Sequence, residues 1–123
     1  MQCVERKTSS DGVKVFRAID RDIVLAELRR WAACQREAHP ELVRVGLFGS
    51  YAKGKHAPGS DLDILLLLTK SPEPVWFMRA KDFDTSGLSV GADLFVYTEA
   101  EAARLQDSSA WFSHILSEVL WID

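Results

Sequence analysis

The 123-residue sequence lacks the features that mark several special classes of protein. It holds two cysteines, Cys3 and Cys34, too few for a disulfide scaffold or a structural zinc site, and we expect both to be ordinary thiols. The N-terminal residues are mixed and charged, so no secretory signal is visible. The longest apolar run, Ile64–Leu68, has five residues, whereas a membrane-spanning helix needs roughly 18 or more. We therefore expect a cytoplasmic protein that does not associate with a membrane.

The sequence also lacks an excess of basic residues. It has 15 Lys and Arg against 18 Asp and Glu, a net charge of −3. Broad, charge-driven binding of nucleic acid requires a basic face, so we expect no direct nucleic-acid binding. The apolar content of 47% and the length suit one globular domain. We predict an N-terminal extension over residues 1–19, with a hairpin or a short strand near Asp11-Gly12, and a single domain over residues 20–123.

Apolar periodicity and turn residues predict alternating helices and strands along the domain. The chain end at Val119–Ile122 fits either a last helical turn or a short strand. The order predicts an α/β (α+β) fold, a small mixed sheet flanked by helices. The predicted elements are a helix from a cap at Asp20 to about Ala38, a strand over Leu42–Phe48, one or two helical turns over 51–54, a strand over Leu62–Leu68, a short helix over Trp76–Asp84, a strand over Ala92–Thr98, and helices over about 99–106 and 110–117.

The stretch from Gly46 to Leu68 combines two features suited to phosphate chemistry. Gly49 and Ser50 end one predicted strand, where backbone N–H groups and a hydroxyl can hold a phosphate. Asp61 and Asp63 stand at the start of the next, and residues two apart on a strand share a face roughly 6.6 Å apart. Two-metal sites hold their ions about 3.5–4 Å apart, a spacing that such carboxylates can serve. The stretch therefore predicts phosphoryl or nucleotidyl transfer from a nucleoside triphosphate.

Gly49-Ser50, ten intervening residues and Asp61-Leu62-Asp63 resemble the signature of the polymerase-β-type nucleotidyltransferase superfamily. The sequence is most similar to its minimal members, the MNT-type domains encoded beside a HEPN-domain protein. The resemblance extends over nearly the whole chain, because the first helix and a later strand with a lone aspartate, Asp93, also match. It implies the nucleotidyltransferase fold.

The resemblance also implies roles for individual residues. Asp61, Asp63 and Asp93 would be catalytic and would bind two Mg²⁺ ions, hard cations that prefer oxygen ligands. Gly49 and Ser50 would bind the triphosphate of ATP. Lys53 stands where many family members have an arginine or lysine, and it would steady the triphosphate as a point charge.

For family members paired with a HEPN protein, the resemblance implies an antitoxin that transfers AMP from ATP to a tyrosine of its toxin. Two alternatives remain open: an antitoxin that neutralises its partner by binding alone, and a small-molecule transferase of the antibiotic-modifying kind. The sequence has no room for a large acceptor-binding domain, so we expect the acceptor to be bound either by a partner chain, in a homo- or hetero-oligomer, or by a shallow groove beside the metal site. An apolar group near the C-terminus is a candidate interface, although core packing would explain most of it: Trp111, Phe112, Leu116, Leu120, Trp121 and Ile122.

Overall fold

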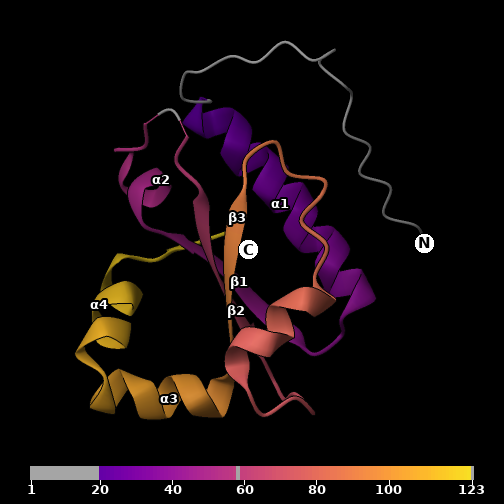
Figure 1. Ribbon diagram of the computed structural model, residues 1–123, viewed down its shortest axis with the longest axis vertical. Helices are drawn as coiled ribbons and strands as arrows, with labels where there is room; N and C mark the ends of the chain where they lie inside the picture. The colour runs from indigo at the N-terminus through magenta and orange to yellow at the C-terminus, as the bar shows by residue number, and fades with distance from the viewer. Residues whose placement is uncertain (1–19, 58, 123) are drawn as a thin grey trace.

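The computed structural model describes residues 20–57 and 59–122, so the predicted N-terminal extension and its hairpin lie outside the described residues. Figure 1 shows helices on both sides of one sheet. Along the described chain the elements are α1 (Arg21–Ala38), β1 (Leu42–Phe48), α2 (Ser50–Lys53), β2 (Leu62–Leu68), η1 (Trp76–Asp82), β3 (Ala92–Thr98), α3 (Glu99–Ser108), α4 (Ala110–Glu118) and β4 (Leu120–Trp121).

The four strands form one mixed sheet in the order β3-β2-β1-β4. β2 pairs antiparallel with β1 and parallel with β3, while β4 pairs antiparallel with β1. β2 therefore has a neighbour on each side, which explains its nearly continuous apolar sequence. β3 has a neighbour on one side only and is an edge strand of the sheet.

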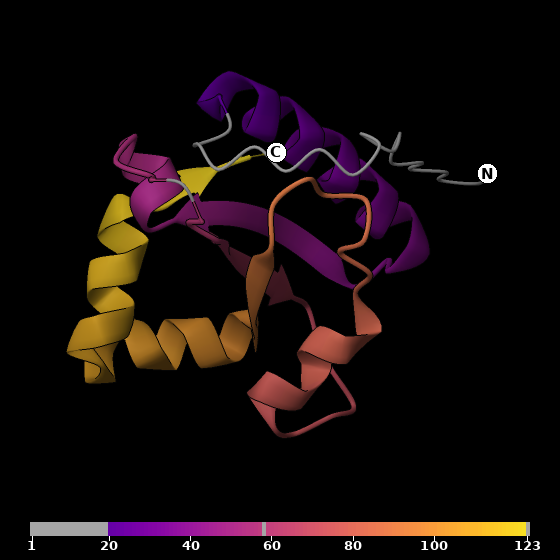
Figure 2. The same cartoon turned by 45° about the horizontal axis from the view of Figure 1, so that its top comes forward.

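The two faces of the sheet are covered by different helices (Figure 2). Alternate residues of β2 divide between two hydrophobic clusters, as the two-residue period of a strand requires. Ile64 and Leu66 pack with Leu28 and Trp31 of α1. Leu65 and Leu67 lie in the second cluster, to which α3 and α4 contribute apolar residues. Asp63 precedes Leu65 by two residues, so it belongs to the face covered by α3 and α4.

The helices begin where the sequence supplies capping side chains. Asp20 accepts a hydrogen bond from the backbone N–H of Asp22 at the start of α1. Thr98 and Glu101 form a reciprocal capping box that begins α3. Such caps satisfy N–H groups that lack a partner in the first helical turn. The bounds of these helices therefore follow from local residue chemistry.

Most predicted elements are confirmed, with a few corrections. The bounds of β1, β2 and β3 agree with the predictions, and the open C-terminal segment contains a strand, β4. η1 is a 3₁₀ helix and ends at Asp82. Cys34 takes part in a disulfide, so the expectation of an ordinary thiol at this position is wrong. Over the described residues, no helix is long and apolar enough to cross a membrane.

Candidate active site

The three aspartates singled out in the sequence lie at one end of the sheet. Asp63 and Asp93 are directly paired in the register between the parallel strands β2 and β3. Asp61 stands two residues before Asp63, next to the pair formed by Leu62 and Ala92. Asp63 is half-buried, whereas Asp61 and Asp93 are exposed. The fold thus brings together carboxylates that are about 30 residues apart in the chain.

The Gly49-Ser50 turn lies directly beside Asp63. Phe48, the last residue of β1, pairs with Asp63 in the antiparallel register. Gly49 follows with φ 81° and ψ −155°, a backbone region that is essentially restricted to glycine. A Cβ at Gly49 would lie 2.3 Å from Oδ2 of Asp63, so the carboxylate occupies the space that a side chain would need. Two separate constraints, conformation and contact, therefore require glycine at this position.

The negative charges of the three aspartates repel one another when no cation is bound at this end of the sheet. Burial raises the pKa of Asp63, and the negative charges of Asp93 and Asp61 raise that pKa further. The carboxylates of Asp61 and Asp63 lie next to different glycines. Oδ2 of Asp63 lies at Gly49, and Oδ1 of Asp61 lies 2.8 Å from the Cβ position of Gly91. The like charges of these carboxylates repel, and a cation between them would remove the repulsion.

The donor set fits Mg²⁺ in chemical type, because carboxylate oxygens are the ligands that this ion prefers. As the side chains lie, no three His, Cys, Asp or Glu residues in the described part of the chain converge to hold an ion. The backbone register places Asp63 and Asp93 side by side on neighbouring strands, two residues from Asp61 in the chain. Asp61, Asp63 and Asp93 could therefore hold the metal.

Lys53, expected to contact the triphosphate, instead forms an ion pair within the fold. Its Nζ lies 3.1 Å from Oε2 of Glu118 at the end of α4, and Nε2 of His114 lies 3.2 Å from the same oxygen. The Lys53 side chain is 43% exposed. An ion pair this open to solvent is weak and exchangeable, so Lys53 can leave Glu118 for a phosphate at little cost.

Two residues that support the turn were not singled out as site residues. Arg21 of α1 donates hydrogen bonds from Nε to the carbonyl of Tyr51 at 2.7 Å and from Nη2 to that of Ala52 at 3.0 Å. The Tyr51 ring is buried and stacks on His56 at 4.2 Å, and burial followed by the charge of Asp61 raises the pKa of Tyr51. Arg21 looks like any helix-surface arginine in the sequence, because its partners lie 30 residues away.

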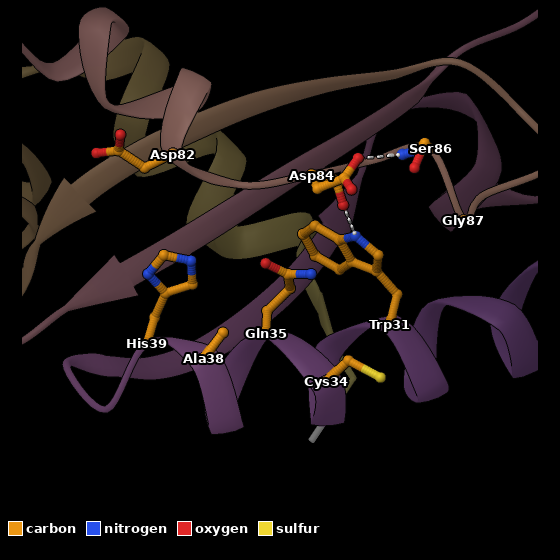
Figure 3. Close-up of a pocket in the computed structure, with 9 residues that line it drawn as sticks. All are labelled: Trp31, Cys34, Gln35, Ala38, His39, Asp82, Asp84, Ser86 and Gly87. Atoms are coloured by element: carbon orange, nitrogen blue, oxygen red, sulfur yellow. Dashed lines mark hydrogen bonds between the residues drawn. The ribbon is translucent and has the colours of Figure 1, made fainter. Parts of the chain in front are cut away.

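A pocket adjoins the carboxylates on the side of β3. It measures about 440 Å³. Asp93 forms part of its wall, beside Phe95 on β3 and the side chains of Trp76, Phe77 and Lys81 on η1. Figure 3 shows a second, separate pocket of about 310 Å³ between α1 and the segment after η1. None of the three aspartates lines that second pocket, whereas Asp93 lines the first, so of these two the pocket beside Asp93 belongs to the candidate site.

In the second pocket the indole of Trp31 donates to the carbonyl of Asp84 at 2.7 Å (Figure 3). Hydrogen bonds from Ser86 lower the pKa of the Asp84 carboxyl. These contacts connect α1 to the segment that leads from η1 into β3. Their role is to hold the fold together on the face opposite to Asp63.

Comparison with known proteins agrees with the geometry. Residues 29–120 match the family described as "Nucleotidyltransferase domain". The chain belongs to this nucleotidyltransferase family. The match includes the Gly49-Ser50 turn and all three aspartates, so the fold expected from the resemblance is confirmed. A search among curated proteins gave no match.

Two solved structures are similar to this nucleotidyltransferase domain. One is a proposed nucleotidyltransferase from Sulfolobus solfataricus, with a TM-score of 0.56 and 26% identity, covering 71% of this chain and 78% of the other. The second is a toxin–antitoxin structure with AMP-PNP, with a TM-score of 0.51 and 20% identity, covering 85% of this chain and 73% of the other. At that identity the second likeness shows the fold alone.

Proposed function

We propose that this chain is an Mg²⁺-dependent adenylyltransferase that moves AMP from ATP to a hydroxyl group, a tyrosine of a HEPN-type toxin partner, and so acts as an antitoxin in the cytoplasm. The observation that carries the proposal is the register of Asp63 with Asp93 beside the Gly49-Ser50 turn. Carboxylates next to an exposed backbone turn are what transfer from a nucleoside triphosphate requires. Membership of the nucleotidyltransferase family supports the same reaction type.

In the proposed reaction the acceptor oxygen forms a bond to the α-phosphorus of ATP. The bond from that phosphorus to the oxygen bridging to the β-phosphorus breaks, and pyrophosphate leaves with the bridging oxygen. The proton of the hydroxyl passes to a carboxylate beside it and then to water. Two Mg²⁺ ions, when bound, would neutralise the phosphates and make the hydroxyl a better nucleophile. The product is a phosphodiester of AMP with the acceptor.

The residues of the chain have separate tasks in this proposal. Asp61, Asp63 and Asp93 hold the metal and present one negative face to it. Backbone N–H groups at Gly49 and the hydroxyl of Ser50 hold phosphate oxygens, and glycine at position 49 leaves room for the Asp63 carboxylate beside them. Lys53 leaves Glu118 and binds the triphosphate.

Two observations support the identity of donor and partner. The toxin–antitoxin structure with the same fold contains AMP-PNP, an ATP analogue, which favours ATP as the nucleotide. That structure is itself a toxin–antitoxin assembly, which favours a toxin as partner. A HEPN-type partner and a tyrosine acceptor follow from the resemblance of the Gly-Ser and Asp-Leu-Asp residues to MNT-type domains.

The experiment combines ATP labelled at the α-phosphate, Mg²⁺ and the protein encoded by the neighbouring gene. We expect label on the partner, none with the variant Asp61→Asn plus Asp63→Asn, and none with EDTA. Equal label from the double variant would refute the proposed site. If the double variant transfers nothing yet protects cells from the partner as well as wild type, neutralisation is by binding alone. Turnover with a hydroxylated small molecule and none with a protein would instead indicate a small-molecule nucleotidyltransferase.

A further inference from the structure

The pocket beside Asp93 lies on the opposite side of Asp63 from the Gly49-Ser50 turn. In the sheet order, β1 leads into the turn on one side of β2, and β3 forms the pocket on the other side. In-line displacement at phosphorus requires the attacking and leaving oxygens on opposite sides. If the turn holds the phosphates that leave, the attacking group arrives from the side of Asp93.

The walls of this pocket suit a flat aromatic ring. Trp76 stacks on Phe95 with ring centroids 6.0 Å apart and an angle of 18° between the planes. Phe77 meets Trp76 edge-to-face at 5.7 Å. A ring entering the pocket can contact these side chains in the offset or edge geometries that aromatic pairs prefer. The volume of about 440 Å³ lies within the range of about 300–1,000 Å³ usual for ligand pockets.

The polar groups of the pocket suit a ring that carries a hydroxyl. Asp93 lies in the wall as a hydrogen-bond acceptor, and Lys81 lies in the wall as a cation. A phenol can donate its proton toward the carboxylate while the ring stays among the aromatic side chains. A purely apolar occupant would leave the desolvated carboxylate without a partner, which is costly.

The rim of the pocket suits a protein rather than a small molecule. Phe77 of the pocket wall and two apolar residues near it in the chain are exposed: Val75 at 38%, Phe77 at 62% and Met78 at 41%. Aromatic side chains and methionine are enriched in the cores of protein interfaces. The rim is also held firmly, because the buried guanidinium of Arg79 donates to the carbonyl of Val96 on β3 at 3.2 Å and pairs with Glu101 at 2.7 Å.

We propose that this pocket receives the aromatic hydroxyl side chain of a partner protein, a tyrosine, and that the exposed η1 rim contacts the surface around it. The inference rests on the proposed function, since it identifies the acceptor site of that reaction. Phe77 sets which side chains can enter, and Asp93 receives the hydroxyl. The competing occupant is the adenine ring of ATP, which is also flat and aromatic.

The test uses amide NMR spectra of the full chain titrated with N-acetyl-L-tyrosinamide, which stands in for the acceptor tyrosine. We expect saturable shifts at Phe77, Lys81 and Asp93, and weaker binding by about 2- to 12-fold in Phe77→Ala, the range for loss of one aromatic contact. Ile23→Ala is the matched control, because Ile23 is 56% exposed on α1. AMP-PNP with Mg²⁺ should shift amides at Gly49 and Ser50 and, through the metal, at Asp93, but not those at Phe77 and Lys81.

Three results would overturn the inference: no pocket shifts up to the solubility limit of the tyrosine compound, equal affinity in Phe77→Ala and wild type, or shifts at Phe77 and Lys81 caused by AMP-PNP. The experiment needs no turnover, so its outcome is separate from that of the label-transfer assay. With a labelled partner in hand, Phe77→Ala should raise the KM for the partner and leave the KM for ATP unchanged. If Phe77→Ala transfers AMP with an unchanged KM for the partner, the pocket is not the acceptor site, although the proposed function stands.

Discussion

Replacing Gly49 by alanine tests whether the turn and the carboxylates form one unit. Gly49 has φ 81° and ψ −155°, and a Cβ there would lie 2.3 Å from Oδ2 of Asp63. Gly54, five residues after Gly49 in the chain, offers a matched control. It also has a positive φ, 71°, but a Cβ there would meet nothing within 4 Å. Both substitutions therefore place alanine at a positive φ, but only Gly49→Ala adds the glycine-only backbone region and the contact with Asp63.

The expected magnitudes follow from these two terms. Alanine in the left-handed region costs about 1–2 kcal/mol, offset by about 0.4–1 kcal/mol because alanine restricts the unfolded chain. Gly54→Ala should thus lower the unfolding free energy by about 0–1.6 kcal/mol. Gly49→Ala adds the strain of an almost exclusively glycine region and an overlap that displaces Asp63, about 1–3 kcal/mol for each. We expect a net loss of about 2–4 kcal/mol.

The measurement is chemical unfolding of four proteins: wild type, Gly49→Ala, Asp63→Ala and the double variant. Removing the Asp63 carboxylate removes the overlap, so Gly49→Ala should cost at least about 1 kcal/mol less in the Asp63→Ala background. The coupling should be absent when Gly54→Ala replaces Gly49→Ala. If the cost of Gly49→Ala is the same in both backgrounds, or equals that of Gly54→Ala, the close contact between turn and carboxylate is wrong.

Further predictions concern charges. Asp63→Asn should raise the unfolding free energy of the metal-free protein by about 0.5–1 kcal/mol in thermal unfolding, because it relieves like-charge repulsion, while Mg²⁺-dependent ATP binding is lost in calorimetry. Glu101→Gln should cost about 2–3 kcal/mol near neutral pH, because it leaves the buried Arg79 guanidinium without its counter-ion. The pKa of Glu101 is lowered from 4.5 to about 2, so unfolding titrations should show this stabilisation fully above pH 4.5 and lost as the pH falls toward 2, and a flat profile would refute it. Glu118→Gln should tighten ATP binding by about 1.5- to 5-fold by releasing Lys53 from its ion pair; unchanged affinity would remove Lys53 from the proposed site.

The sequence predicted the strands and the grouping of the aspartates well, for reasons that are local. β2 is an apolar run that begins directly after Asp61, and a period of two assigns Asp63 to one face. The Gly49-Ser50 turn can be recognised in the sequence because glycine is the residue that tolerates its backbone geometry. The Thr98-Glu101 box likewise fixes the start of α3 through contacts within one turn. Each of these features depends on residues within a few positions of one another.

The features that sequence reasoning missed depend on distant partners. Arg79 pairs with Glu101 across 22 positions, and Arg21 reaches the turn carbonyls across 30. No local pattern distinguishes these arginines from surface ones, because only the packed fold places the partners beside them. The pairing of Lys53 with Glu118 is of the same kind. Sequence alone therefore predicts which residues can bind phosphate or metal. The fold determines which partners these residues have in the protein without ligand, as Lys53 has Glu118.

The two ends of β3 argue that the aspartate end is the functional one. At its last residue, Thr98 joins a satisfied network in which Glu101 binds both the cap and the buried Arg79. Near its first residue, Asp93 adds negative charge beside Asp63, whose pKa is already raised by burial. Unfavourable charge is concentrated beside the glycine-specific backbone of Gly49, although the same strand shows that this fold can neutralise a carboxylate. Natural sequences keep such local conflicts where a ligand resolves them, and a cation bound with a nucleotide phosphate would resolve this repulsion.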